Sequence, residues 1–239
     1  MTTNEKICII FDVDQTLLDK DSDVKQFHLL PENEYKKFIN EEYYSWEEHV
    51  NKFYRLMKKY GKTKEDVKNK IFEMCLSPKM EKFLNYLHNN KNKYELFILS
   101  AANSFIINCV LECHKLKDYF TFILCNNLNI NSNNDLTFTE IGITKNCKLC
   151  YPRGCKSKIF KSYFTDEKLN KYSKIIFICD GKNGFCLACS LKINSYIFVR
   201  KNYRLDEMLK DEENNKKLKN KNIFKWENGD DLLSFIKNI

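Results

Sequence analysis

Five short apolar runs, rich in β-branched and aromatic residues, recur along the chain. They span Ile7 to Phe11, Leu96 to Leu99, Phe122 to Cys125, Ile175 to Cys179 and Tyr196 to Val199. Each run has the length of a strand, and helix-length segments separate most of them. Continuous apolar strands joined by helices are typical of a parallel sheet that is covered on both faces. The pattern therefore predicts an α/β protein built on a doubly wound parallel sheet.

The connection between the first two runs is long and carries helix signals instead of a strong strand signal. Ser45 to Glu48 has the pattern of a capping box, and Thr63 to Asp66 starts another helix. Ser77-Pro78 supplies an N-cap followed by proline at the first helical position.

These signals divide the chain into two parts. We expect residues 21–77 to form a helical cap subdomain inserted after the first strand, in the position of a lid over the carboxyl ends of the strands. Residues 1–20 and 78–239 then form the α/β core domain.

Composition limits the classes of protein that the chain can represent. A chain of 239 residues with 43% hydrophobic content can bury a substantial core. Its apolar runs are too short for a membrane span, and residues 1–6 lack the apolar core of a signal peptide. We therefore expect a soluble, cytoplasmic protein without membrane contact, in which most of the 11 cysteines are thiols.

The net charge of +8 is spread over lysine- and asparagine-rich segments with acidic residues interleaved. This distribution favours a solvated basic surface over a nucleic-acid interface, because no aromatic-studded basic motif accompanies it. The sequence contains no feature that defines an oligomeric state.

Two carboxylates, Asp12 and Asp14, follow directly after the first apolar run. Open parallel sheets bind ligands beyond the carboxyl ends of their strands. Residues two apart in a strand share a face, so these carboxylates repel unless a cation or proton intervenes. Such a pair suits a metal-assisted reaction with one carboxylate as nucleophile and the other as proton carrier. The competing interpretation is a strand-to-loop turn with solvated carboxylates.

Three further strand ends carry residues that a phosphate site needs. Ser100 closes the second run and opens a helix, which offers a hydroxyl and a helix N-terminus to a phosphoryl oxygen. Lys156 begins another helix and supplies a fixed cation. Asp180 ends the fourth run with a carboxylate, and oxygen ligands favour magnesium over zinc. Each residue alone fits an ordinary N-cap, a surface lysine or a turn former; together they indicate a magnesium-dependent phosphate site.

The cysteines include one spacing typical of metal ligands. Cys147, Cys150 and Cys155 are candidates for three ligands of a structural zinc, but no fourth ligand is evident nearby, so thiols are the simpler interpretation. Cys186 and Cys189 lie three residues apart in the segment after Asp180, and we assign them to core packing.

Over nearly its whole length the chain resembles the haloacid-dehalogenase (HAD) superfamily of phosphatases, which has a Rossmann-like core. Within this superfamily it is most similar to the family of phosphoethanolamine/phosphocholine phosphatase and the pyridoxal-phosphate phosphatase-like proteins. The segments that carry the resemblance are Phe11-Asp12-Val13-Asp14-Gln15-Thr16, Asp19-Lys20-Asp21-Ser22-Asp23, Phe53-Tyr54-Arg55-Leu56-Met57, Leu99-Ser100-Ala101-Ala102-Asn103, Cys147-x2-Cys150-x4-Cys155-Lys156, Asp180-Gly181-Lys182-Asn183, Arg200-Lys201-Asn202-Tyr203 and Trp226.

The resemblance implies a two-step phosphoryl transfer from a small phosphorylated metabolite. Asp12 would attack phosphorus to form an aspartyl-phosphate, while Asp14 would protonate the leaving alcohol and later activate water. The phosphoryl oxygens would be held by Thr16, Ser100 and Lys156. Magnesium would be bound by the Asp12 carboxylate, the Asp14 backbone carbonyl and the Asp180 carboxylate.

Two positions depart from the family pattern. Ala101 replaces the usual aspartate after the serine, which makes cationic substrates such as phosphocholine and phosphoethanolamine poor candidates. Gly184 replaces an aspartate expected to hold a metal-bound water, so we expect weakened magnesium affinity. These departures also motivate an alternative, a weak or inactive relative that binds a phosphorylated ligand or a partner protein.

Overall fold

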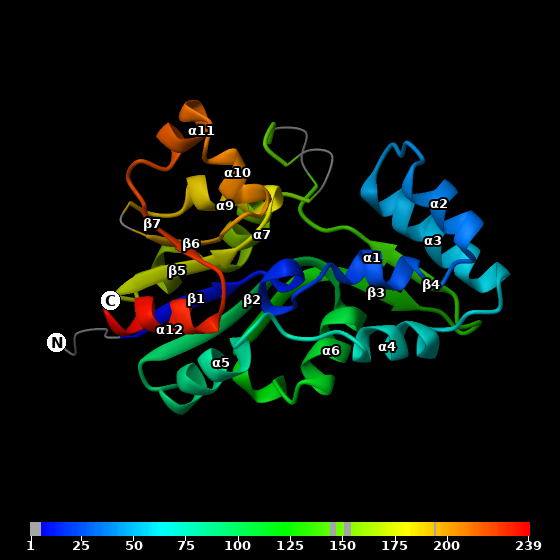
Figure 1. Cartoon of the computed structure of the whole chain (residues 1–239), viewed down its shortest axis with the longest axis horizontal. Coiled ribbons are helices and arrows are strands. Elements are labelled where there is room, and N and C mark those ends of the chain that lie inside the picture. The colour runs from blue at the N-terminus through cyan, green and yellow to red at the C-terminus, as the bar shows by residue number, and fades with distance from the viewer. Residues whose placement is uncertain (1–5, 144–146, 151–153, 194) are drawn as a thin grey trace.

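A seven-stranded sheet with the order β4-β3-β2-β1-β5-β6-β7 forms the centre of the protein (Figure 1). The computed structural model describes residues 6–143, 147–150, 154–193 and 195–239. The strands are β1 (Ile7–Phe11), β2 (Tyr94–Asn103), β3 (Phe122–Ile130), β4 (Leu136–Thr139), β5 (Lys174–Cys179), β6 (Tyr196–Arg200) and β7 (Asn222–Trp226). Neighbouring strands are parallel except for β3 and β4. The predicted α/β fold with a doubly wound sheet is confirmed.

Strand β1 lies in the middle of the sheet and is buried on both faces. Ile7, Ile9 and Phe11 pack into one hydrophobic cluster, whereas Cys8 and Ile10 pack into another on the opposite face. This alternation follows from the two-residue period of a strand. The helices over the first face are α5 (Met80–Asn89), α6 (Ser104–Cys113) and α12 (Gly229–Lys237), and those over the second are α7 (Lys156–Tyr163), α9 (Lys182–Ser190) and α10 (Arg204–Met208).

The edge strands β4 and β7 were not among the predicted runs. Both are short and partly exposed and include polar residues, and each pairs with only one neighbouring strand. An edge strand that is partly solvated lacks the continuous apolar run that marks a central parallel strand. The remaining short helices are η1 (Val13–Leu17), η2 (Lys117–Tyr119), α8 (Asp166–Leu169) and α11 (Glu212–Lys217).

Residues 21–77, all of which are described, form helices and contain no strand. These helices are α1 (Ser22–Phe27), α2 (Glu32–Ile39), α3 (Trp46–Lys59) and α4 (Lys64–Phe72). The predicted starts of α3 and α4 are confirmed. The Ser45 side chain accepts a hydrogen bond from the Glu48 N–H, and Thr63 forms a reciprocal capping box with Asp66.

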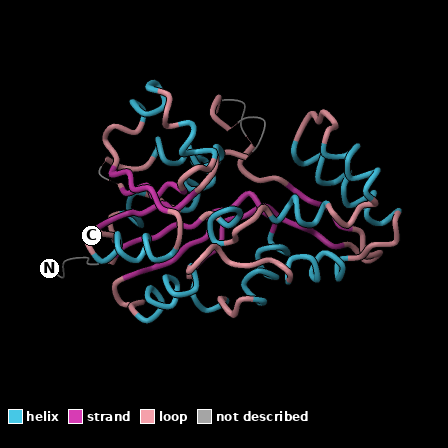
Figure 2. The backbone as a smooth tube through the Cα atoms, in the orientation of Figure 1, coloured by secondary structure: helices cyan, strands magenta, loops and turns pink. Residues whose placement is uncertain are grey.

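The antiparallel β3–β4 hairpin extends toward these inserted helices, at the end of the molecule away from the chain termini (Figures 1 and 2). The Asn51 side chain of α3 forms two hydrogen bonds with the backbone of Phe138 in β4, both 2.8 Å long. The β3–β4 hairpin thus packs on residues 21–77 although it lies outside the predicted cap. The inserted helices also contact the core directly, where α4 packs against α6.

The predicted N-cap at Ser77 is wrong. Helix α5 begins at Met80, and its N-cap is Lys79, which has a φ of +59°. The Ser77 hydroxyl instead donates to the Leu18 carbonyl at 3.1 Å. A hydrogen bond to a distant part of the chain has replaced the local cap, and it fixes the returning chain beside the exit of β1.

No helix within the described portion of the chain is long and apolar enough to span a bilayer. Residues 1–5, which include most of the segment examined for a signal peptide, lie outside the described residues. All 11 cysteines carry free thiols in the structure.

Candidate active site

Asp12 lies at the carboxyl end of β1 and is only 3% exposed. Its backbone N–H donates to Ile178 at 3.0 Å, which ties it to β5, and its Oδ1 accepts a hydrogen bond from the Val13 N–H at 2.9 Å. Its Oδ2 forms an ion pair with the Nζ of Lys156, the first residue of α7, whose side chain is 2% exposed. A buried charge needs such a partner, because desolvation costs several kcal/mol per ion. The structure therefore brings together two residues 144 positions apart, as predicted.

Asp14 occupies the loop that follows. Its Oδ1 accepts a hydrogen bond from the Ser22 N–H at 2.8 Å, so the loop is fixed to the start of α1. Burial raises the pKa of Asp14 well above its ordinary value, and the nearby carboxylates of Asp21 and Asp23 raise it further. These surroundings favour a protonated Asp14, which is the form that a general acid requires.

Arg200, at the end of β6, holds the loop from the other side. Its guanidinium donates to the Gln15 carbonyl at 2.9 Å and to the Asp19 carboxylate at 2.6 Å. Gln15 has a φ of +52°, a left-handed conformation that costs a non-glycine residue about 1–2 kcal/mol. Arg200 is 4% exposed, and Trp226 packs against its guanidinium. Sequence reasoning assigned no role to Arg200, although the residue stood in one of the segments that carry the family resemblance.

Asp180 directly follows β5, is 6% exposed and accepts a hydrogen bond from the Thr16 hydroxyl at 3.5 Å. Burial and the Asp12 carboxylate together raise the pKa of Asp180 to about 7, although Lys156 lowers it. Lys156 thus supplies one positive charge near two buried carboxylates: it pairs with Asp12 and also lowers the pKa of Asp180. This excess of negative charge and the oxygen donors fit a magnesium ion, which prefers carboxylate and carbonyl ligands.

A cavity of about 310 Å³ opens at these strand ends. Its lining includes Asp12, Asp14 and Asp180, together with Ala101. Thr16, Lys156 and Ser100 are buried residues that do not line the cavity themselves; Thr16 and Lys156 contact its carboxylates.

Two cations that sequence reasoning missed also line this cavity. Lys182 begins α9 and Arg204 begins α10, and both side chains are exposed. Lys182 stood in the quoted motif, whereas Arg204 had no signal beyond a charged residue after a strand. Both place positive charge at the edge of an acidic cavity.

Ser100 does not open a helix as predicted. Strand β2 continues to Asn103, helix α6 begins at Ser104, and Asn103 is the N-cap that accepts from the Ile106 N–H at 3.0 Å. The Ser100 Oγ instead accepts a hydrogen bond from the Ala102 N–H at 3.1 Å. The pairing of β2 with β3 is irregular between Leu99 and Asn103, which accommodates the longer strand. Ser100 therefore contributes a hydroxyl from within β2, three residues before the strand ends, and no helix N-terminus accompanies it.

Gly184 is buried on α9 beside the site. A Cβ atom at this position would lie 3.1 Å from the Phe177 ring and 3.3 Å from the Cys179 Cβ. Phe177 thus fills the space that an aspartate side chain would need. A carboxylate at this position would require the Phe177 ring to shift.

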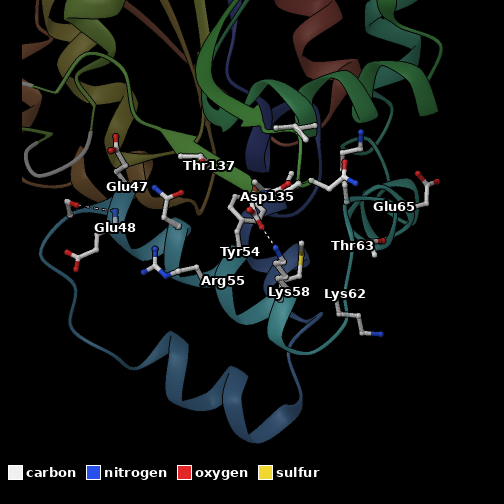
Figure 3. Close-up of a pocket in the computed structure, with 18 residues that line it drawn as sticks. Glu47, Glu48, Tyr54, Arg55, Lys58, Lys62, Thr63, Glu65, Asp135 and Thr137 are labelled. Atoms are coloured by element: carbon white, nitrogen blue, oxygen red, sulfur yellow. Dashed lines mark hydrogen bonds and ion pairs between the residues drawn. The ribbon is translucent and has the colours of Figure 1, made fainter.

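A larger cavity of about 1000 Å³ lies between α3, the start of α4 and the β3–β4 hairpin (Figure 3). Tyr54, Arg55 and Lys58 line it from α3, and Lys58 forms an ion pair with Asp135 across it. None of the predicted site residues lines this cavity. The smaller cavity, which contains the buried carboxylates, is therefore the candidate active site.

Comparison with known proteins identifies the class of this molecule. The fold matches a solved structure titled "Phospho-Aspartyl Intermediate Analogue of Phosphoserine phosphatase", with a TM-score of 0.63, 17% identity, and coverage of 98% of this chain and 99% of that chain. The chain therefore shares the fold of that structure. The chain belongs to the family described as "Putative Phosphatase", whose model matches residues 7–239.

Two curated relatives show the same family relationship. Pyridoxal phosphate phosphatase PHOSPHO2 of Bos taurus is 29% identical over 237 residues, which cover 97% of this chain and 98% of the relative. Phosphoethanolamine/phosphocholine phosphatase of Gallus gallus is 24% identical over 212 residues, which cover 87% of this chain and 79% of the relative. The chain is therefore a HAD-type phosphatase, a phosphoric monoester hydrolase, and the predicted family and enzyme class are confirmed.

Proposed function

We propose that the chain is a magnesium-dependent phosphatase that hydrolyses small phosphomonoesters through an aspartyl-phosphate on Asp12. The observation that carries this proposal is the buried Asp12–Lys156 ion pair, whose Asp12 lines one cavity together with Asp14 and Asp180. A buried lysine beside the nucleophile offsets the charge of an incoming phosphoryl group, so that two anions can approach.

In the first step, an Asp12 carboxylate oxygen forms a bond to phosphorus while the bond from phosphorus to the alcohol oxygen breaks. Asp14 donates its proton to the departing alcohol oxygen, which leaves as a neutral alcohol. In the second step, Asp14 accepts a proton from water as the water oxygen bonds to phosphorus. Inorganic phosphate is released and the Asp12 carboxylate is restored.

The remaining residues orient and neutralise the phosphoryl group. Magnesium, held by the carboxylates of Asp12 and Asp180 and the backbone carbonyl of Asp14, would supply positive charge to the transferring group. Lys156 supplies a further fixed charge. The hydroxyls of Thr16 and Ser100 are the donors that we assign to phosphoryl oxygens.

Two cations line this otherwise acidic cavity and are candidates to contact an anionic substrate. Ala101 provides no carboxylate to a cationic head group, while Lys182 and Arg204 line the same cavity with positive charge. The Bos taurus relative, which matches 97% of this chain, is named as a pyridoxal phosphate phosphatase. We therefore infer that anionic phosphomonoesters of the pyridoxal phosphate kind are better substrates than phosphocholine or phosphoethanolamine.

We also propose that residues 21–77 act as a cap over this site. Asp21 and Asp23 line the catalytic cavity from the start of the insertion. A buried network joins the insertion to the core: the Asn103 side chain donates to the Tyr54 hydroxyl at 3.0 Å, and Tyr54 donates to Gln26 at 3.2 Å. The insertion is thus placed to control which substrates enter.

Hydrolysis of p-nitrophenyl phosphate with and without magnesium tests this proposal. We expect wild-type turnover to require magnesium, and Asp12→Asn to reduce it by at least about 10³-fold, because the nucleophile is lost. Asp135→Asn, which changes an exposed carboxylate in the larger cavity, is the matched control and should remain active. Metal-independent turnover, or an active Asp12→Asn protein, would contradict the proposal.

A further inference from the structure

Four cysteine thiols gather beside the candidate active site, in a group that the proposed reaction does not use. They are Cys147, Cys150, Cys155 and Cys186, and their Sγ atoms all lie within 4.8 Å of one another. The Sγ atoms of Cys155 and Cys186 are 3.8 Å apart, and those of Cys147 and Cys150 are 2.9 Å apart. Cys147 is partly buried and the other three are buried.

The separations distinguish between the chemical states that four thiols can adopt. A disulfide requires about 2.05 Å between sulfurs, so neither pair is bonded. Zinc bound tetrahedrally by sulfur at about 2.3 Å places neighbouring sulfurs about 3.8 Å apart. The Cys155–Cys186 separation of 3.8 Å matches that value, whereas the Cys147–Cys150 separation of 2.9 Å has to widen when both sulfurs bind one ion. All four Sγ atoms lie within 4.8 Å of one another, which is close enough for one zinc ion to contact each of them after this adjustment.

Helix packing brings two of these sulfurs together. Cys155 is the N-cap of α7, Cys186 lies in the middle of α9, and these two helices pack against each other. The Cys147-x2-Cys150 spacing is common in structural zinc sites, where a short turn presents two sulfurs to one ion.

We propose that Cys147, Cys150, Cys155 and Cys186 together bind one structural zinc ion. This corrects the expectation that the site lacks a fourth ligand and that Cys186 only packs in the core. The ligand was missed because it lies 31 residues beyond Cys155, and only the packing of α9 against α7 brings it there. With four protein sulfurs, the site is closed and has a structural role.

The zinc site connects three parts of the active site. Cys155 directly precedes Lys156, whose side chain pairs with Asp12. Cys150 lines the catalytic cavity, and Cys186 belongs to the helix that follows Asp180. Zinc therefore fixes the start of α7 relative to α9, and this keeps the Lys156 side chain paired with the Asp12 carboxylate.

The test is metal analysis of the reduced, full-length protein purified without chelator. We expect about one zinc per chain, as in other closed four-cysteine sites. Cys186→Ser should lose most of this zinc, whereas Cys189→Ser, on the same helix but outside the cluster, should keep it. Removing zinc from the wild type should lower its melting temperature, and adding zinc back should restore it.

If Cys186→Ser does not fold, X-ray absorption at the zinc edge of the wild-type protein still identifies the ligands of the bound metal. The proposal predicts a shell of sulfur neighbours alone, at about 2.3 Å. Reduced protein that neither contains zinc nor binds added Zn²⁺ would overturn it. So would iron as the bound metal, nitrogen or oxygen in the zinc shell, or a Cys186→Ser protein with the zinc content of Cys189→Ser.

Discussion

Asp180→Asn should stabilise the metal-free protein at alkaline pH while abolishing its response to magnesium. The Asp180 carboxylate is buried beside Asp12, and these surroundings raise its pKa from the ordinary 3.8 to about 7. A raised pKa means that the folded protein binds this proton more tightly than the unfolded chain does. Stability from this group is therefore fully present below about pH 4 and falls as the pH rises toward 7.

The size of the effect follows from the same shift. Raising a pKa from 3.8 to about 7 corresponds to about 4 kcal/mol. Asparagine has no charge to desolvate and can still accept the Thr16 hydrogen bond. In EDTA at pH 8 we therefore expect Asp180→Asn to be more stable than the wild type by roughly 2–4 kcal/mol, with the difference shrinking toward zero at pH 4.

The assay is urea unfolding in EDTA across this pH range, repeated at pH 8 with saturating magnesium. Magnesium should stabilise the wild type and leave Asp180→Asn nearly unchanged, because binding to the folded state alone raises stability. Asp135→Asn, an exposed carboxylate paired with Lys58, should change stability by less than about 1 kcal/mol. A pH-independent difference, or an Asp180→Asn protein less stable than the wild type at pH 8, would refute the electrostatic reasoning.

Three further substitutions test separate parts of the site. Lys156→Met should reduce turnover by at least about 10²-fold and destabilise the protein by about 3–5 kcal/mol at pH 8, because Asp12 is left buried without its partner. Steady-state kinetics measure the turnover and urea unfolding measures the stability. A fully active variant would exclude a role for this lysine. Gly184→Asp should lower the free energy of unfolding, measured in urea, by about 1–3 kcal/mol, because the Phe177 ring lies where the new side chain begins. An unchanged stability would show that the ring moves aside freely. Ala101→Asp should shift the ratio of kcat/KM values toward phosphocholine over pyridoxal phosphate by about fivefold, as expected for about 1 kcal/mol from one added charge pair. A ratio unchanged by the new carboxylate would remove Ala101 from the account of specificity.

The central sheet and its strand-end residues were predictable because their signals are local. Each central strand is a continuous apolar run, and parallel strands direct their carboxyl ends to one edge. Asp12, Asp14 and Asp180 therefore met in one cavity as expected. The edge strands β4 and β7 were missed because they are short and partly exposed, and the polar residues within them interrupt the continuous apolar run that marks a central strand.

What could not be predicted depends on contacts between distant segments. Ser77 was assigned to a helix cap, but its hydroxyl bonds to Leu18, 59 residues away. Arg200 reaches Gln15 across 185 positions, and Cys186 joins Cys155 through helix packing. Local patterns give residue types and spacing, whereas these partners are set only when the helices and strands have packed.

Trapping the phosphorylated enzyme is the most direct test of the Asp12 mechanism. A single turnover with a phosphomonoester and magnesium, quenched in acid and digested with pepsin, can be analysed by mass spectrometry. We predict one phosphoryl group on the peptide that contains Asp12, and none in Asp12→Asn. Phosphate release from the wild type without any phosphorylated protein at a series of quench times, or a phosphoryl group on another residue, would contradict Asp12 as the nucleophile.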